Sequence, residues 1–170
     1  MINTKRLSIV PLEREDIEPL RLMRNDPTTR HWLSDTSIIS KEAQEKWFNR
    51  LVDDSSRLYL AIKDKKNKLV GVLRSDQWDR INHSVRVGLD IHPDFRGKGL
   101  GTEAFQGFID YLFNEQGMHR LWLLVAENNE IAIRLYARLG FSTEGKMRDA
   151  LLRDGKYLDY CCMSIVRKDF

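Results

Sequence analysis

The sequence predicts a single mixed α/β domain with about seven strands and about four helices. Three observations lead to this prediction. Segments in which apolar and polar residues alternate, typical of strands, occur along the whole chain. Segments with apolar residues at every third or fourth position, typical of helices, interrupt them. The chain has 170 residues, of which 42% are hydrophobic, and this is enough for one domain with one core.

The first part of the chain is expected to form one strand and two helices. Residues 7–10 alternate in polarity and are followed by a proline, which predicts a strand that ends there. Residues 13–23 carry apolar side chains at helical spacing, and the Asn-Asp-Pro that follows ends this helix. Ser40 is a suitable N-cap, so a second helix is predicted from there to about residue 53.

Three strands are predicted next. Residues 58–62 and 69–75 are apolar runs, and the lysine-rich segment 63–68 between them is interpreted as a solvated turn. Residues 83–91 alternate so regularly that one face of the strand is apolar while the other carries polar or small residues. A His-Pro pair then ends this strand.

The second half of the chain alternates between helix and strand and ends in two strands. Gly140 stands where a left-handed residue commonly terminates a helix. Asp154-Gly155 is suited to the turn before the last strand. The predicted elements are helices over residues 102–114 and 129–139 and strands over residues 120–125, 141–145 and 157–166.

Composition argues against several classes of protein. The net charge is +3, and no concentrated basic stripe indicates nucleic-acid binding, whereas a mild basic excess fits an anionic coenzyme. No apolar run approaches the ~18 residues of a membrane span, and the N-terminus lacks the apolar core of a signal peptide, so a cytoplasmic protein is expected. Cys161 and Cys162 are adjacent, which disfavours a bond between them, and no Cys and His spacing predicts a metal site.

A glycine-rich segment, Arg96-Gly97-Lys98-Gly99-Leu100-Gly101, joins a predicted strand to a predicted helix. Its glycines permit positive φ, and successive N–H groups at a helix start bind anions, to which Arg96 and Lys98 add charge. The segment lacks the spacing of both the Rossmann and the Walker phosphate loops. It fits the pattern [RQ]-x-x-G-x-[GA] at Arg96, Gly99 and Gly101.

A second motif begins about thirty residues later. Asn129 is a suitable N-cap, and Ala132 permits close approach to the helix that follows. Tyr136 comes seven residues after Asn129, which is two helical turns, so both side chains lie near one face of the helix.

Together the two motifs resemble those of the GCN5-related N-acetyltransferase (GNAT) superfamily. Its pattern N-x-x-A-x-x-L-Y followed by L-G-F is matched by Asn129, Ala132, Leu135, Tyr136 and Leu139-Gly140-Phe141. The order of the predicted elements is also similar to the fold of that family. The resemblance covers nearly the whole chain and implies one acetyltransferase domain over residues 1–170 that uses acetyl-CoA and no metal.

The resemblance also implies roles for particular residues. The backbone of residues 89–91 would contact the pantetheine arm and polarise the thioester carbonyl, and Asn129 would bind the arm from the other side. Tyr136 would protonate the CoA thiolate. The general base is open: Asp90, which lies on the polar face of its strand, is one candidate, and His83 and Asp35 are others. The residues predicted to bind the cofactor are Leu89, Asp90, Ile91, Arg96, Gly97, Lys98, Gly99, Leu100, Gly101, Thr102, Asn129, Ala132 and Tyr136.

The acceptor amine is open, because three branches of the superfamily resemble this chain. Residues 24–48 resemble amino-sugar nucleotide acetyltransferases, which favours a nucleotide-linked amino sugar. Residues 12–16 and 148–157 resemble ribosomal-protein N-terminal acetyltransferases, and residues 80–83 and 141–145 resemble spermidine acetyltransferases. A ribosomal-protein N-terminal amine and a polyamine such as spermidine are therefore the alternatives. The residues predicted to bind the acceptor are Arg30, Trp32, Asp35 and His83.

A non-catalytic module that binds acetyl-CoA is the alternative from another class of function. The presence of Tyr136 at the family's catalytic position favours the enzyme. The family resemblance also implies a homodimer or a larger homo-oligomer, and neither a nucleic acid nor a membrane is expected as a partner.

Overall fold

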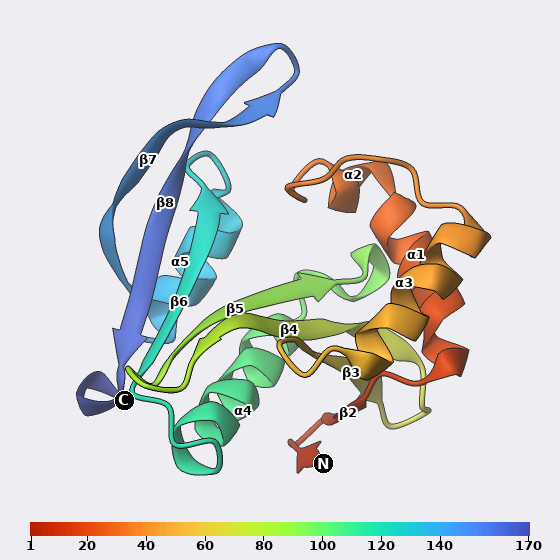
Figure 1. Ribbon diagram of the computed structural model, residues 1–170, viewed down its shortest axis with the longest axis horizontal. Helices are drawn as coiled ribbons and strands as arrows, with labels where there is room; N and C mark the ends of the chain where they lie inside the picture. The colour runs from red at the N-terminus through yellow and green to blue at the C-terminus, as the bar shows by residue number, and fades with distance from the viewer.

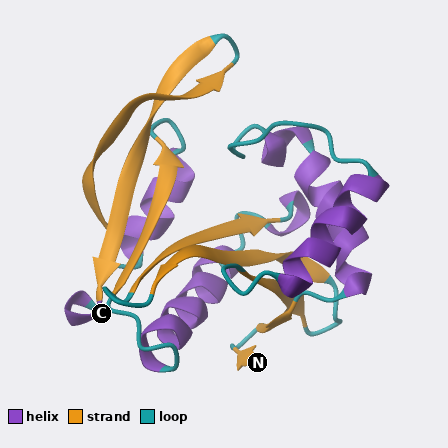
Figure 2. Ribbon diagram, in the orientation of Figure 1, coloured by secondary structure: helices purple, strands orange, loops and turns teal.

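The computed structural model describes residues 1–170 as one mixed sheet of eight strands with five α-helices packed against it (Figures 1 and 2). The strand order is β1-β2-β3-β4-β5-β6-β8-β7. The strands are β1 (Ile2–Asn3), β2 (Leu7–Pro11), β3 (Leu58–Asp64), β4 (Leu69–Asp79), β5 (Ser84–Ile91), β6 (Arg120–Ala126), β7 (Ser142–Arg153) and β8 (Lys156–Val166). The helices are α1 (Ile17–Asn25), α2 (Pro27–Arg30), α3 (Lys41–Asp53), α4 (Leu100–Asn114) and α5 (Glu130–Arg138).

The sheet has an apolar cluster on each face. The larger cluster lies beneath α4 and α5 and includes the fully buried Phe105 and Phe108. The smaller cluster lies beneath α1 and α3 and includes Leu20, Met23 and Phe48. Because neighbouring residues of a strand point to opposite faces, β3 and β4 contribute side chains to both clusters.

The two central strands separate along their length, and this creates the site described below. β5 and β6 are parallel, but only residues 84–86 of β5 pair with residues 120–122 of β6. Beyond this point β5 bends away from β6 (Figure 1). Residues 89–91 therefore pair with β4 on one side only, and no strand pairs with them on the side that faces β6.

The predicted α/β architecture is confirmed, with differences in the number and length of the strands. The short β1, which pairs with Ile9 and Ser8, adds an eighth strand. β4 continues four residues beyond the predicted end, to Asp79, and β7 continues eight residues beyond its predicted end, to Arg153. β7 is an edge strand with two irregularities in its register and an almost fully exposed surface, so it lacks the apolar alternation from which its length could be predicted. No helix has the length and apolar character needed to cross a membrane.

The prediction of a solvated turn over residues 63–68 is wrong for Lys63. This residue belongs to β3, and its side chain is buried against the carboxylate of Asp16, with an N···O distance of 2.9 Å. Burial alone would lower the pKa of the Lys63 ammonium, but the hydrogen bond and the charge of Asp16 outweigh it and raise that pKa. A more distant carboxylate, that of Glu15, lies 3.4 Å away and is exposed.

Replacing Asp16 with Asn is expected to reduce the free energy of unfolding by about 2 kcal/mol, because a buried ammonium would lose its charge partner. The exposed Glu15 provides the matched control, and Glu15→Gln is expected to cost less than about 1 kcal/mol. Urea unfolding of both variants checks this. Equal losses in the two variants would contradict the importance of the buried pair.

Candidate active site

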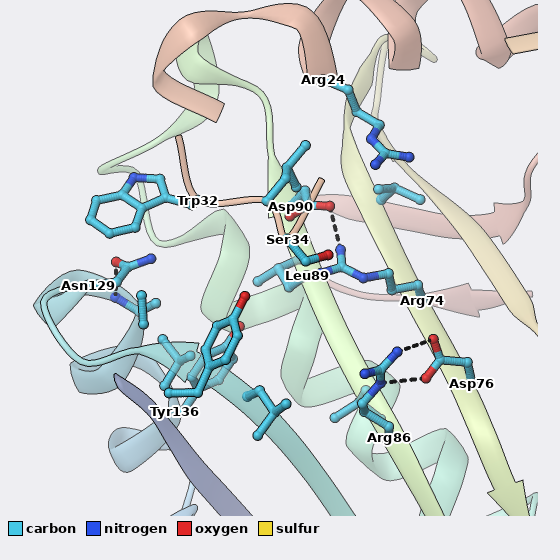
Figure 3. Close-up of a pocket in the computed structure, with 18 of the residues that line it drawn as sticks. Arg24, Trp32, Ser34, Arg74, Asp76, Arg86, Leu89, Asp90, Asn129 and Tyr136 are labelled. Atoms are coloured by element: carbon cyan, nitrogen blue, oxygen red, sulfur yellow. Dashed lines mark hydrogen bonds and ion pairs between the residues drawn. The ribbon is translucent and has the colours of Figure 1, made fainter. Parts of the chain in front are cut away.

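A cavity of about 350 Å³ lies where β5 and β6 separate (Figure 3). Its walls come from β4, β5, β6 and α5, and α1 and the segment after α2 close it from above. Five of the residues predicted to bind the cofactor line this cavity: Leu89, Asp90, Asn129, Ala132 and Tyr136. The separation of the strands thus brings together residues that are 47 positions apart in the chain, from Leu89 to Tyr136.

The glycine loop adopts the backbone conformation that an anion site requires. Gly97 and Gly99 have φ values of 72° and 73°, in the left-handed region that favours glycine. Gly99 precedes the first residue of α4, a helix of 15 residues. The N–H groups of residues 97–99 donate no backbone hydrogen bond, so they and the start of α4 can bind phosphate oxygens.

The two charged side chains of this loop also contact the protein itself. The Arg96 guanidinium donates to the Ile91 carbonyl and to the hydroxyls of Thr28 and Thr29. The Lys98 ammonium donates to a backbone carbonyl, that of Asp94. All of these acceptors are neutral, so neither positive charge is cancelled by a carboxylate. Both charges contribute to an electropositive loop, as the sequence predicts.

Gly101 explains why helix and strand can approach each other here. It lies in the first turn of α4, and a Cβ at this position would be 3.3 Å from the side chains of Leu89 and Ile91 and 3.4 Å from that of Leu135. A larger residue would require these side chains to shift. The match of this position to the family pattern therefore has a packing reason.

Asn129 caps α5 on the opposite wall of the cavity. Its Oδ1 accepts a hydrogen bond from the backbone N–H of Ala132, at 3.2 Å, which begins the helix. The Nδ2 group makes no hydrogen bond within the chain and faces the cavity (Figure 3). It can donate to a ligand that lies between α5 and β5.

The hydroxyl of Tyr136 points into the cavity from the same helix (Figure 3). The ring is held by Phe105 and Phe141, whose ring centroids lie 5.4 and 5.9 Å from that of Tyr136. Burial raises the pKa of the hydroxyl to about 12, with a smaller opposing contribution from Arg74. Tyr136 is therefore protonated throughout the physiological range of pH and can act as a proton donor.

Two ion pairs cross from β4 to β5 on the floor of the cavity. The guanidinium of Arg74 donates to Asp90 Oδ2, and that of Arg86 forms a bidentate pair with Asp76, at 2.6 and 2.7 Å. Gly88 leaves room for the first pair, because a Cβ there would lie 2.7 Å from Arg74 Cζ. The predicted candidate base, Asp90, thus lies in the cavity with one oxygen engaged and Oδ1 without a hydrogen bond.

The structure places one of the four predicted acceptor-binding residues at the cavity. Trp32 lies at its rim, with 38% of its surface exposed (Figure 3). Arg30, the last residue of α2, and Asp35, in the loop that follows, are not among the residues that line the cavity. His83 also lies outside the lining: it precedes β5 at the end remote from the cavity and contacts the Gly117 carbonyl at 3.1 Å.

Prediction from the sequence missed several residues of the cavity. The most prominent are three arginines and one aspartate: Arg24, Arg74, Arg86 and Asp76. The alternating polar face of residues 83–91 signals that Arg86 and Asp90 point the same way. The partner strand was predicted to end before Asp76, so the pairing across the two strands was not visible.

Comparison with known proteins identifies the family to which the chain belongs. A family model described as "Acetyltransferase (GNAT) domain" matches residues 6–142. The spermidine N(1)-acetyltransferase of Escherichia coli K12 is 26% identical over all of this chain and 91% of its own length. The [ribosomal protein uS5]-alanine N-acetyltransferase of the same organism is 30% identical over 76% of this chain and 68% of its own length.

Among solved structures, the spermidine N-acetyltransferase of Vibrio cholerae in complex with CoA and spermine superposes with a TM-score of 0.93 at 24% identity. The superposition covers 98% of each chain. This similarity establishes the fold. The family match agrees with the separated strands and the glycine loop, and the chain therefore belongs to the GNAT family and is an acetyl-CoA-dependent N-acetyltransferase.

Proposed function

We propose that this enzyme transfers the acetyl group directly from acetyl-CoA to a primary amine, with Tyr136 as the general acid. One observation supports this most strongly. The protonated hydroxyl of Tyr136 and the unpaired backbone edge of β5 face each other across a single cavity. The hydroxyl can donate a proton to the leaving group, and the backbone edge can donate hydrogen bonds to the carbonyl oxygen.

The chain's residues divide the reaction between them. The amine nitrogen forms a bond to the carbonyl carbon of the thioester, and the carbon–sulfur bond then breaks with its electron pair on sulfur. Backbone N–H groups of residues 89–91 would stabilise the negative charge on the carbonyl oxygen. Tyr136 would give its proton to the thiolate, and the proton that the attacking nitrogen loses as the neutral amide forms would restore the Tyr136 hydroxyl, directly or through water. The loop at residues 96–101 would hold the pyrophosphate, with Leu100 and Thr102 at the start of α4.

The acceptor must be uncharged at nitrogen before it can attack. Asp90 Oδ1, which accepts no hydrogen bond in the chain, would take up the proton of the incoming ammonium directly or through water. Arg74 holds the other oxygen and fixes the orientation of the carboxylate. Asp90 is therefore the proposed base.

The comparisons favour one alternative for the acceptor over the preferred prediction from the sequence. Relatives named as spermidine acetyltransferases match the whole length of the chain, whereas none of the relatives described above is named for a nucleotide-linked amino sugar. Spermidine is therefore the first acceptor to test. A ribosomal-protein N-terminus is the next, because of the relative that acts on uS5.

A panel of amines with acetyl-CoA and detection of released thiol tests the proposed function. It should contain spermidine, a nucleotide-linked amino sugar and an N-terminal alanine peptide. Thiol release that depends on one of these amines is expected for the wild-type protein. Binding of acetyl-CoA without thiol release for any amine would instead identify a non-catalytic binding module.

We also propose that the enzyme forms a homo-oligomer. The spermidine N-acetyltransferase of Vibrio cholerae has been solved as a dodecamer. In this chain the long hairpin of β7 and β8 projects from the sheet and exposes Met147, Leu152 and Tyr157 (Figure 1). Light scattering of the purified protein tests this, and a monomer at all concentrations would contradict it.

A further inference from the structure

The cavity between β5 and β6 is lined by more positively charged than negatively charged side chains. Among its lining residues, the carboxylates are those of Asp76 and Asp90, and the guanidinium groups are those of Arg24, Arg74 and Arg86. Both carboxylates are engaged by arginines of the neighbouring strand, Asp76 by Arg86 and Asp90 by Arg74. Arg24 is therefore left without a carboxylate partner in the cavity.

Arg24 forms no ion pair and no hydrogen bond with the rest of the chain. It lies on α1, where the residue is half-buried, and its Nε atom is buried without any partner. The carboxylate of Asp35 acts on it from a distance. That carboxylate is exposed and accepts a hydrogen bond from the backbone N–H of Ser37, at 2.8 Å. Its pKa is lowered mainly by the hydrogen bonds with Ser37 and less by the charge of Arg24. A partly buried guanidinium with an unpaired donor is costly unless a ligand satisfies it.

From its position, Arg24 can contact the acceptor but not the phosphates of the cofactor. In Figure 3 Arg24 extends from α1 on one side of the cavity, and Asn129 and Tyr136 lie on the other. The glycine loop, where the phosphates of the cofactor are expected, is at the start of α4 and outside this cavity. An acceptor that presents its amine to Tyr136 and Asp90 would extend toward Arg24.

We propose that Arg24 binds an anionic group, a carboxylate or a phosphate, on the same molecule as the acceptor amine. This inference rests on the proposed transfer at this cavity and specifies the class of acceptor. Arginine is suited to the role because its planar guanidinium donates two parallel hydrogen bonds to either anion. Trp32 at the rim adds an apolar surface along which the body of such an acceptor can lie.

A polyamine would meet a different environment here. Its second ammonium group would approach a guanidinium, and the carboxylates that could neutralise it already hold Arg74 and Arg86. The names of the relatives support spermidine, whereas the charges of this cavity support an amino acid or an amino phosphate. The two expectations can be separated by experiment.

The test compares acceptors of similar size that differ in charge: butylamine, 4-aminobutyrate, O-phosphoethanolamine, putrescine and spermidine. Thiol release gives kcat/KM for each, and calorimetry in the presence of CoA gives the Kd of each amine independently of turnover. The variant is Arg24→Gln, which removes the charge at a position that bonds to nothing else in the chain. Arg30→Gln is the matched control, because Arg30 is nearby in sequence but outside the cavity.

For the wild-type protein, at least a tenfold preference for 4-aminobutyrate or phosphoethanolamine over butylamine is expected in kcat/KM and in Kd. The ratio between these two anions shows which of them Arg24 recognises. Arg24→Gln should bring the values for the two anions to those for butylamine in the same variant, and Arg30→Gln should retain the preference. A wild-type preference for spermidine that Arg24→Gln leaves unchanged would overturn the proposal.

Failure of the proposed transfer gives a distinguishable result. If no amine releases thiol, acetyl transfer is contradicted, but the binding measurements still decide the role of Arg24. Anion-selective binding that is lost in Arg24→Gln would support it, and equal affinity for butylamine and 4-aminobutyrate would refute it.

Discussion

Replacing Tyr136 with Phe is expected to lower kcat by about 10²-fold or more, because general acid catalysis contributes a factor of about 10² to 10⁴. The affinity for acetyl-CoA should not change. The hydroxyl makes no hydrogen bond in the chain, and the ring keeps its contacts with Phe105 and Phe141. Saturating kinetics and calorimetry with acetyl-CoA measure the two quantities separately.

Tyr160 offers a matched control for this prediction, since it also lines the cavity but belongs to β8. Tyr160→Phe should keep kcat within a few-fold of the wild-type value. If the two variants lost activity equally, the loss could not be assigned to proton donation by Tyr136. Unchanged kcat in Tyr136→Phe would contradict the role outright.

The dependence of the rate on pH should reflect the same residue. The neutral fraction of an aliphatic amine with a pKa near about 10 rises with pH, so kcat/KM should rise up to that value. Tyr136 stays protonated up to its own pKa of about 12, so its ionisation should cause no decline below about pH 11. A profile that falls between pH 8 and 10 in the wild type but not in Tyr136→Phe would contradict the raised pKa.

Replacing Gly99 with Asp is expected to weaken acetyl-CoA binding by about 10²-fold. The carboxylate would face the pyrophosphate across the N–H groups that bind it, and the φ of 73° adds backbone strain of about 1 kcal/mol. The new Cβ would lie 3.5 Å from Arg6 Nη2, an ordinary contact, so the fold has room for it. Calorimetric titration with CoA measures the effect.

The control for Gly99→Asp is Gly117→Asp. Gly117 has a φ of 66°, and a Cβ added there would have no atom within 4 Å, so this substitution carries similar strain far from the loop. The Gly117→Asp variant should lose some stability but bind CoA normally. Wild-type affinity in Gly99→Asp would show that the pyrophosphate lies elsewhere.

The sequence by itself was sufficient for most elements of the fold and for the two local motifs on which the proposed cofactor site rests. Strands and helices follow from the periodic spacing of residues over a few positions of the chain. Val85 and Val87 in β5 and Tyr136 in α5 belong to such local patterns. The glycine loop and the start of α5 are also local, because positive φ and helix capping depend on adjacent residues. These features do not require knowledge of the sheet.

Tertiary structure alone decided which charged side chains line the cavity and how they are paired. Lys63 resembles its neighbouring lysines until the contact with Asp16, 47 positions away, buries it. The pair of Arg74 and Asp90 depends on the register between β4 and β5, and a shift of one residue would move either side chain to the other face. Arg24 stands out only because its neighbours in space leave it without a partner. Such pairings depend on contacts between residues that are far apart in the chain, and they cannot be recognised from the order of the residues alone.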